Sequence, residues 1–432
     1  MRWDVIVAGA GTAGLTAAVR AAQSGRKVLV LAKGAGATHL SPLTIDVLGY
    51  APDRVDSPQA SLGGFLADNP DHPYARTGEA AIGEALAWFS DLMADAYPYV
   101  GGLERNILLP SAVGAWRPSA LVPVTMAEGD LRRDEPMVIV GLRQLKDFHP
   151  ALLADNLQRA GVSARAVELD IEFDRVDVNT VGLARALDRP EVRSLLAAQL
   201  AVRLKSGERV GFPAALGLRH AHTVWSELQD RLGRPVFEIP TVPPSVPGLR
   251  VDRILTAALR AAGGRVILGS EVVGAEPDAD GVTIRAKAAA RDIEHRADWL
   301  VLATGGFAEG SIMLDADWRA RETVLDLPLA HVPAAGEPRF VPDYFDAQPM
   351  ARVGAAVDAG LRPVGPDGAR VHERVLVAGA SIGGAVPWKE HSGEGISVTT
   401  GYHAAGEIVP KASPSVGSSS QSDELPGTRA TA

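Results

Sequence analysis

The chain has 432 residues, which at roughly 100–200 residues per domain predicts two or three domains. It is 46% hydrophobic and 22% charged, an ordinary globular balance, and its net charge of −9 argues against nucleic acid or an anionic lipid surface as the main partner. Because the chain contains no cysteine, it holds no disulfide, thiolate nucleophile or Cys-ligated metal or iron–sulfur centre, so redox chemistry would need an organic cofactor or another subunit.

The apolar stretches are too short to cross a membrane. The longest uncharged ones, Val5–Val19 and Val375–Trp388, fall short of the ~20 residues required and are interrupted by glycines. The first of them is unlike a signal peptide, because Asp4 precedes it and no basic segment does. We therefore expect a cytoplasmic protein with no direct membrane span, held at the inner face of the cell membrane only through a partner.

The first 32 residues predict a strand–turn–helix–strand unit. Val5–Ala8 is a short apolar strand, residues 9–14 form a glycine-rich turn, and Leu15–Ser24 is an alanine-rich helix. Lys27–Ala32 is a second apolar strand. This is a βαβ unit with almost no spare residues.

The rest of the chain alternates between loops and further apolar segments. Residues 37–75 are rich in Pro, Asp and Gly, which predicts loops, and the Ser/Pro/Gly-rich segment 407–432 predicts a disordered tail. A hairpin is expected around Asp278–Gly281. Helices are predicted over Ala80–Tyr97, Ala151–Ala160, Val251–Ala262 and Ile396–Ala405, and strands over Pro136–Gly141, Arg265–Leu268, Trp299–Ala303 and Arg374–Ala378.

Strand–turn–helix units occur at both ends and in the middle of the chain, which predicts one α/β, Rossmann-like domain built from discontinuous segments. This domain takes residues 1–50, 251–310 and 366–406. Residues 51–250 and 311–365 are then inserted as an α+β second domain. In such folds the ligand usually lies in the crevice between the layers.

The glycine turn carries the first chemical signal. Gly9-Ala10-Gly11-Thr12-Ala13-Gly14 matches G-x-G-x-x-G, and it follows a strand and opens a helix. In this pattern Gly9 permits the tight turn, Gly11 lets the backbone approach a phosphate, and Gly14 lets helix and strand pack closely. The free N–H groups of the helix then face the anion. The alternative is a glycine turn needed only for packing.

One expected part of a dinucleotide site is missing. An acidic residue normally ends the second strand and binds the ribose of the adenosine, but Ala32 stands there, followed by Lys33. Two explanations remain open: the site holds a mononucleotide such as FMN, or FAD binds with its adenosine held by other groups. Lys33 alternatively suggests the 2′-phosphate of NADP.

Two later glycine clusters suggest the other walls of a flavin site. Thr304-Gly305-Gly306 follows a strand, and its small residues let the backbone pass closely under a cofactor. A helix that starts near residue 393 would direct N–H donors at the N1/O2 edge of an isoalloxazine ring and stabilise its reduced form. The residues of this third cluster expected at the cofactor are Gly379, Gly383, Gly393, Glu394, Gly395 and Ile396.

The chain resembles a known flavoprotein family, the B-subunit family of anaerobic glycerol-3-phosphate dehydrogenase, over nearly its whole length except the polar tail. The most specific stretch is the proline-rich run P-T-x-P-P-S-V-x-G-x-R at residues 240–250. The other matching segments are His39-Leu40-Ser41, Ile45-Asp46-Val47-Leu48, His72-Pro73-Tyr74, Pro213-Ala214, Leu216-Gly217-Leu218, Pro387, Gly393, Gly395 and His403-Ala404-Ala405.

The resemblance implies an FMN-containing subunit that pairs with a larger FAD-bearing catalytic subunit and an iron–sulfur subunit that docks the pair to the membrane. It implies oxidation of sn-glycerol 3-phosphate to dihydroxyacetone phosphate, with electrons passed to quinone for fumarate or nitrate respiration. The chain departs from the family pattern at Glu394, where the pattern has glycine. A carboxylate at this position would disfavour the anionic form of a reduced flavin. The alternative is that Glu394 has no redox role and is an acid favoured in the first turn of a helix.

Oxidation of a secondary alcohol by flavin needs a base for the hydroxyl proton and cations for the substrate phosphate. His39, His72 and His391 are candidate bases, and Arg117 and Arg250 are candidate phosphate ligands, although structural roles are the alternative for each. Ser41 and Asp46 lie in the loop expected to approach the flavin ring, and no spacing indicates a metal site. Two other functions remain open: a stand-alone FAD-dependent oxidoreductase of the fumarate reductase or ketosteroid dehydrogenase type, and a non-catalytic electron-relay or structural partner.

Overall fold

The largest sheet of the molecule is assembled from three segments that lie far apart in the sequence. The computed structural model describes residues 2–171, 178–289 and 291–408. Within them the sheet has the order β11-β2-β1-β14-β13-β12, with β19 paired to the end of β14. Its strands are β1 (Arg2–Ala8), β2 (Val28–Ala32), β11 (Arg265–Leu268), β12 (Ser270–Asp278), β13 (Gly281–Ala288), β14 (Arg291–Leu302) and β19 (Val375–Val377).

The centre of this sheet is parallel, and its outer hairpin is antiparallel. β1 pairs in parallel with β2 and with β14, and β14 pairs in parallel with β19. All five residues of β2 are buried, as expected for a parallel strand covered on both faces. The strand–helix–strand unit and the hairpin around Asp278–Gly281 are therefore confirmed, and the fold is the α/β, Rossmann-like one expected.

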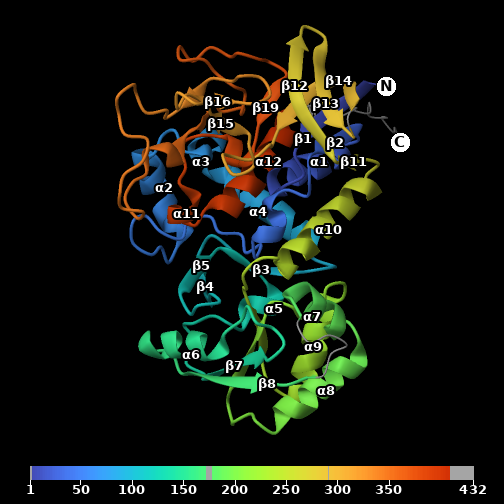
Figure 1. Ribbon diagram of the computed structural model, residues 1–432, viewed down its shortest axis with the longest axis vertical. Helices are drawn as coiled ribbons and strands as arrows, with labels where there is room; N and C mark the ends of the chain where they lie inside the picture. The colour runs from blue at the N-terminus through green and yellow to red at the C-terminus, as the bar shows by residue number, and fades with distance from the viewer. Residues whose placement is uncertain (1, 172–177, 290, 409–432) are drawn as a thin grey trace, which may run out of the picture.

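Helices α1 (Thr12–Gln23), α10 (Val246–Ala261) and α12 (Gly393–Ile408) contact this sheet, and α4 (Glu79–Met93) packs outside α12. Helix α1 contacts both α12 and α10, and α4 lies against α12. In Figure 1 the N-terminal strands and the red C-terminal helix lie together in the upper half of the molecule. The first and last parts of the chain therefore share one hydrophobic core.

The structure differs from the sequence expectation at residues 37–75, which contain helices as well as loops. They form a 3₁₀ turn (Ala37–Leu40), α2 (Pro58–Asp68) and α3 (Pro73–Thr77). The Ser57 hydroxyl and the His72 ring each accept a hydrogen bond from the first turn of the helix that follows. The prolines that suggested loops are thus first-turn prolines after a capping residue. At the other end, α12 extends to Ile408, and residues 409–432 of the predicted tail lie outside the described residues.

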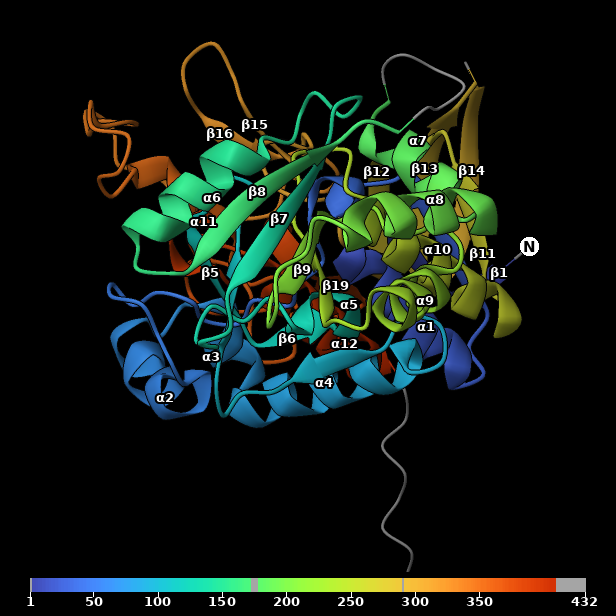
Figure 2. The ribbon, with the colours of Figure 1, turned by 90° about the horizontal axis from the view of Figure 1, so that it is seen from below.

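A second, wholly parallel sheet occupies the lower half of the molecule (Figure 1), in the order β10-β9-β7-β8. Its strands are β7 (Met137–Leu142), β8 (Ala164–Leu169), β9 (Arg209–Pro213) and β10 (Val236–Ile239). Figure 2 shows α6 to one side of it and α7, α8 and α9 to the other. These helices are α6 (Pro150–Arg159), α7 (Thr180–Leu187), α8 (Pro190–Ala201) and α9 (Ala221–Leu232).

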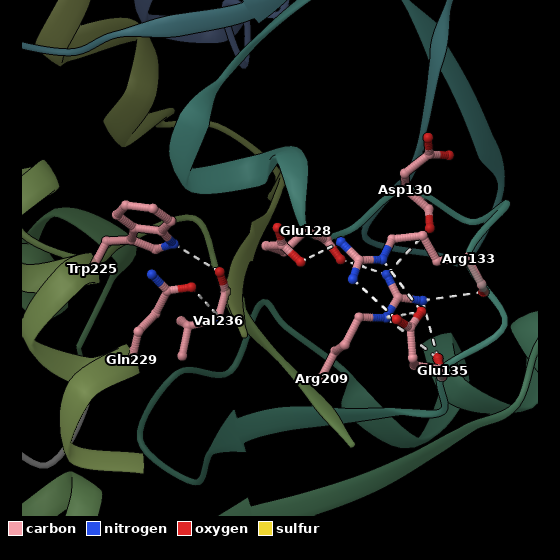
Figure 3. Close-up of polar contacts among 8 residues, drawn as sticks. All are labelled: Glu128, Asp130, Arg133, Glu135, Arg209, Trp225, Gln229 and Val236. Carbon is pink, nitrogen blue, oxygen red and sulfur yellow. Dashed lines mark hydrogen bonds and ion pairs between the residues drawn. The ribbon is translucent and has the colours of Figure 1, made fainter. Parts of the chain in front are cut away.

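Arg209 ties a loop to this second sheet. Its buried guanidinium, on β9, donates to the backbone carbonyls of Glu128, Asp130, Arg133 and Glu135 (Figure 3). Burial, and then the neighbouring Arg133 charge, lowers the pKa of Arg209. At the start of β10, the Trp225 indole N–H donates to the Val236 carbonyl at 2.7 Å. The part of the molecule that contains the second sheet thus has its own hydrophobic core and its own side-chain to backbone hydrogen bonds.

The remaining elements are short. β3 (Tyr99–Gly101) pairs with β6 (Leu121–Pro123), β4 (Ile107–Pro110) with β5 (Trp116–Ser119), β15 (Ile312–Leu314) with β16 (Ala320–Glu322), and β17 (Leu329–Ala330) with β18 (Gly354–Ala355). α5 (Val124–Ala127) and α11 (Pro387–Glu390) are single turns, and 3₁₀ turns cover Pro349–Arg352 and Gly379–Ser381. No helix in the described ranges combines the length and hydropathy that a membrane span needs.

Candidate functional site

The three glycine clusters singled out in the sequence meet around one cavity of about 430 Å³. That volume lies within the range of ~300–1,000 Å³ common for small-molecule sites. The turn after β1, the segment after β14 and the segment after β19 each contribute to its wall. The predicted cofactor residues that line it are Gly9, Gly11, Thr12, Ala13, Ala32, Lys33, Thr304, Gly305, Gly379 and Glu394.

The turn after β1 has the geometry of an anion cradle. Gly9 has φ +114°, and a Cβ there would overlap the carbonyl oxygen of Ala303 on the neighbouring segment. Gly11 caps helix α1, and a Cβ on it would meet no atom within 4 Å, so this backbone is open to the cavity. The free N–H groups at the start of α1 are therefore available to an anionic ligand.

Hydroxyl groups fix the two opposite walls. The Thr304 and Ser311 hydroxyls lie 2.7 Å apart, and the Ser381 hydroxyl donates to the Gly305 carbonyl at 2.8 Å. On the third segment, the Gly379 N–H donates to the Thr400 hydroxyl of α12 at 2.8 Å. These bonds hold the segments after β14 and β19 against each other without placing bulky side chains in the cavity.

An ion pair forms part of the cavity wall. Ala32 ends β2 as expected and offers no acceptor, while the Lys33 ammonium lies 3.1 Å from the Glu271 carboxylate on β12. Both charged side chains line the cavity and are partly exposed. Glu271 was not anticipated from the sequence, because its partner is 238 residues away along the chain.

The first turn of α12 forms another part of the cavity wall, which Glu394 and Ser397 line. Burial, more than the nearby Asp46 charge, raises the pKa of Glu394, although hydrogen bonds with the Ser41 and Thr12 hydroxyls oppose the shift. The Glu394 Oε2 atom is buried and has no hydrogen-bond partner among the described residues.

Asp46 and Arg117 form an ion pair near Glu394 without lining the cavity. The Arg117 guanidinium on β5 donates to the Asp46 carboxylate and, at 3.0 Å, to the Thr44 hydroxyl. The second Asp46 oxygen, Oδ1, is buried and has no partner in the described part of the chain. Arg117, a candidate phosphate ligand, is thus already engaged by a carboxylate and a hydroxyl.

The three candidate histidines lie in different environments. His39 lines the cavity, and its Nδ1 is buried without a partner among the described residues. His72 is fully buried: its Nδ1 accepts from the Tyr74 N–H, and its Nε2 lies 3.1 Å from the Glu390 carboxylate. His391 stacks edge-on against Tyr50 outside the cavity wall, and burial lowers its pKa. Of the three, only His39 lines the cavity.

Arg250 occupies a structural position rather than the expected phosphate site. It is 2% exposed and forms a two-point ion pair with Glu238, at 2.7 and 2.9 Å. It also donates to the Gly217 carbonyl and, at 2.9 Å, to the Tyr97 hydroxyl. Burial alone would lower the pKa of Arg250, but Glu238 and Tyr97 outweigh burial and raise it. Arg250 therefore joins α10 to the second sheet.

The other predicted cofactor residues support the cavity from behind or lie outside it. The Ser41 hydroxyl accepts from the Leu43 N–H, and the Gly306 N–H donates to the Glu309 carboxylate. Gly395 packs tightly against Tyr74 and the Asp46 backbone. The predicted residues absent from the cavity wall are Gly14, Ser41, Asp46, Gly306, Gly383, Gly393, Gly395 and Ile396.

Several polar groups in the wall were not identified from the sequence. They are Glu271, Glu309, Ser311, Thr323 and Ser397. No motif surrounds any of them, although Ser397 follows directly on the predicted helix start and could have been inferred from it.

Comparison with known proteins agrees with this geometry. A family model described as an FAD binding domain matches residues 4–396. The chain is 32% identical over 426 residues to the B-subunit of the anaerobic glycerol-3-phosphate dehydrogenase of Pectobacterium atrosepticum, covering 96% of this chain and 100% of that protein. It is 35% identical over 428 residues to the probable B-subunit of the same enzyme in Halobacterium salinarum, covering 95% and 98%.

Among solved structures, 3-ketosteroid delta1-dehydrogenase from Sterolibacterium denitrificans is similar at 13% identity with a TM-score of 0.43. The match covers 94% of this chain and 99% of that one.

Proposed function

The chain belongs to the B-subunit family of anaerobic glycerol-3-phosphate dehydrogenase, and from this premise we propose that it is the flavin-bearing subunit of such an enzyme. The proposed complex oxidises sn-glycerol 3-phosphate to dihydroxyacetone phosphate and passes the electrons to quinone. The observation that carries the proposal is that three distant backbone segments border one cavity with an open anion cradle.

The cavity suits a flavin nucleotide. The start of α1 would hold the phosphate, because the open backbone at Gly11 and the free N–H groups meet there. The first turn of α12 would border the ring, and the walls around Gly305 and Gly379 would enclose the space between. A bound flavin supplies the two-electron acceptor that oxidation of an alcohol requires.

We further propose FMN as the cofactor, although the matching family model is named for FAD. Ala32 has no group to hold an adenosine ribose, and the neighbouring Lys33 is paired with Glu271 in the cavity wall. A mononucleotide has no adenosine and therefore needs no such group. Flavin released by heat from the purified protein should therefore run as FMN on chromatography, and recovery of FAD alone would contradict this assignment.

His39 is the residue best placed to accept the substrate's hydroxyl proton, because it lines the cavity and keeps an unpartnered ring nitrogen. The test is to mix the purified, flavin-loaded chain with glycerol 3-phosphate without oxygen and follow the flavin absorbance. Bleaching that is lost in a His39→Ala variant supports oxidation on this chain. Bleaching only after the catalytic subunit is added would show that the chain relays electrons instead.

An exposed aromatic cluster supports the proposal of partner subunits, namely an FAD-bearing catalytic subunit and an iron–sulfur subunit at the inner face of the membrane. Tyr344 and Phe345 are 71% and 78% exposed, and Tyr344 lies against Trp388 of α11 with ring centroids 5.6 Å apart. Trp318 and Phe340 form a second exposed pair. Aromatic side chains gathered on a surface are characteristic of protein interfaces.

A further inference from the structure

Glu394 is a partly buried acid in the wall of the proposed flavin cavity, and it forms no ion pair of its own among the described residues. It lies in the first turn of α12, and its Oε2 atom is buried without a hydrogen-bond partner in the described part of the chain. The neighbouring contacts are neutral hydroxyls, from Thr12 on α1 and Ser41 after the 3₁₀ turn. A first-turn acid on an exposed helix would instead be solvated and favoured as a carboxylate.

The charged groups that face Glu394 favour its protonated form. Asp46 is a second carboxylate close by, and it acts together with burial to raise the pKa of Glu394. Arg117 opposes this effect, but its guanidinium is engaged by Asp46 and Thr44. Tyr99 is a further titratable neighbour, and it is buried with its hydroxyl donating to the Leu43 carbonyl.

We propose that flavin binds the form of this chain in which Glu394 is a neutral carboxylic acid, and that its O–H serves as a hydrogen-bond donor to the bound nucleotide. The inference rests on the proposed function, because it takes the cavity to be the flavin site. A flavin offers acceptors on its N1–C2=O edge and along its phosphate. A neutral acid can donate to such acceptors, whereas an unpaired carboxylate would repel them.

The test is the pH dependence of FMN affinity, measured by fluorescence quenching on flavin-free, folded protein for the wild type and for Glu394→Gln. Glutamine keeps a donor and cannot ionise. The ratio of the wild-type to the variant Kd should stay near one in mild acid and then rise about tenfold per pH unit above the pKa of Glu394 in the protein. Titration of the FMN phosphate and of His39 is common to both proteins and cancels in that ratio.

Two further variants make the test specific. Asp46→Asn should move the rise in the Kd ratio to lower pH, because it removes a negative neighbour and frees the Arg117 charge to stabilise the Glu394 carboxylate. Glu271→Gln is the matched control: this acid also lines the cavity, but it pairs with Lys33 and is not among the groups that shift the pKa of Glu394, so its loss should leave the rise where it is in the wild type.

The outcomes separate the inference from the function on which it rests. A Kd ratio that does not change with pH, or a Glu394→Gln variant that binds FMN more than tenfold more weakly at every pH, would overturn the inference. If the wild type binds neither FMN nor FAD at any pH, the proposed function itself fails. Should Glu394→Gln not fold, infrared difference spectra of the wild type decide, because the carbonyl stretch of a protonated acid must disappear as the pH is raised through the range where affinity falls.

Discussion

Replacing Arg250 by methionine is expected to destabilise the whole chain while leaving flavin binding by the folded protein intact. The substitution removes the cation from Glu238, which is 0% exposed and keeps only the Leu216 N–H, the Thr125 hydroxyl and the Tyr97 hydroxyl as donors. Loss of one partner from a buried ion pair typically destabilises a protein by about 3–5 kcal/mol, because the other charge stays buried and unpaired.

That magnitude can be measured as a shift in the thermal midpoint. An unfolding entropy of about 2.1 cal/mol/K per residue gives ~0.9 kcal/mol/K for 432 residues. The expected shift for Arg250→Met is therefore about 3–6 °C downward, followed by circular dichroism. The flavin-to-protein ratio of the folded fraction should match the wild type, because Arg250 does not line the cavity.

Two controls define the interpretation of this shift. Arg253→Met changes an exposed arginine on the same helix, whose guanidinium donates only to the Arg219 carbonyl, and should leave the midpoint nearly unchanged. The double variant Arg250→Met, Glu238→Gln removes both charges and should recover about 1–3 kcal/mol relative to the single variant. A midpoint within about 1 °C of the wild type for Arg250→Met would refute the reasoning.

Four further predictions concern the cavity and its surroundings. Gly11→Val should fold with a near-normal midpoint but lose its flavin absorbance, since the new side chain enters the open cradle; a fully yellow variant would place the phosphate elsewhere. Glu394→Gln should raise the midpoint more at about pH 8 than at about pH 5, because the folded wild type retains a proton that the unfolded chain releases above the ordinary pKa of 4.5. Glu390→Gln should lower the midpoint at neutral pH, and this loss should shrink as the pH falls below 4.5. The reason is that the pKa of Glu390 is lowered in the folded protein: burial opposes this shift, but the hydrogen bond with His72 helps to produce it. The pair Tyr344→Ser, Phe345→Ser should keep its midpoint but lose co-purification with the co-expressed catalytic subunit, whereas Val202→Ser, at an 85% exposed position elsewhere, should retain it.

The parts of the structure that local sequence determines were predictable. The βαβ unit follows from two apolar runs and one glycine turn, and the three glycine clusters do share a cavity. Helices α2 and α3 were missed because a proline was taken as a loop signal, although Ser57 and His72 stand before Pro58 and Pro73 as capping residues. A capping residue followed by proline can be recognised in the sequence, but it marks a helix start only if the residues that follow form a helix.

The roles of isolated charged residues could not be predicted in the same way. Arg250 ends a proline-rich run and was a candidate phosphate ligand, whereas it lies within α10 and pairs with a glutamate on β10. The Lys33–Glu271 and Arg117–Asp46 pairs likewise join residues far apart in sequence. A charge acquires its function from burial and from its partner, and both of these are set by the tertiary fold.

The discontinuous sheet also determines when the protein can be completed during its synthesis. The four strands of the second sheet come from residues 137–239, a single stretch that can pair as it leaves the ribosome. The anion cradle opened by Gly9 must wait for β19 and α12, which are synthesised long after β1. Until β19 and α12 are made, the apolar N-terminal strands lack their final neighbours, and an incomplete chain in that state is a species for chaperones and proteases to remove.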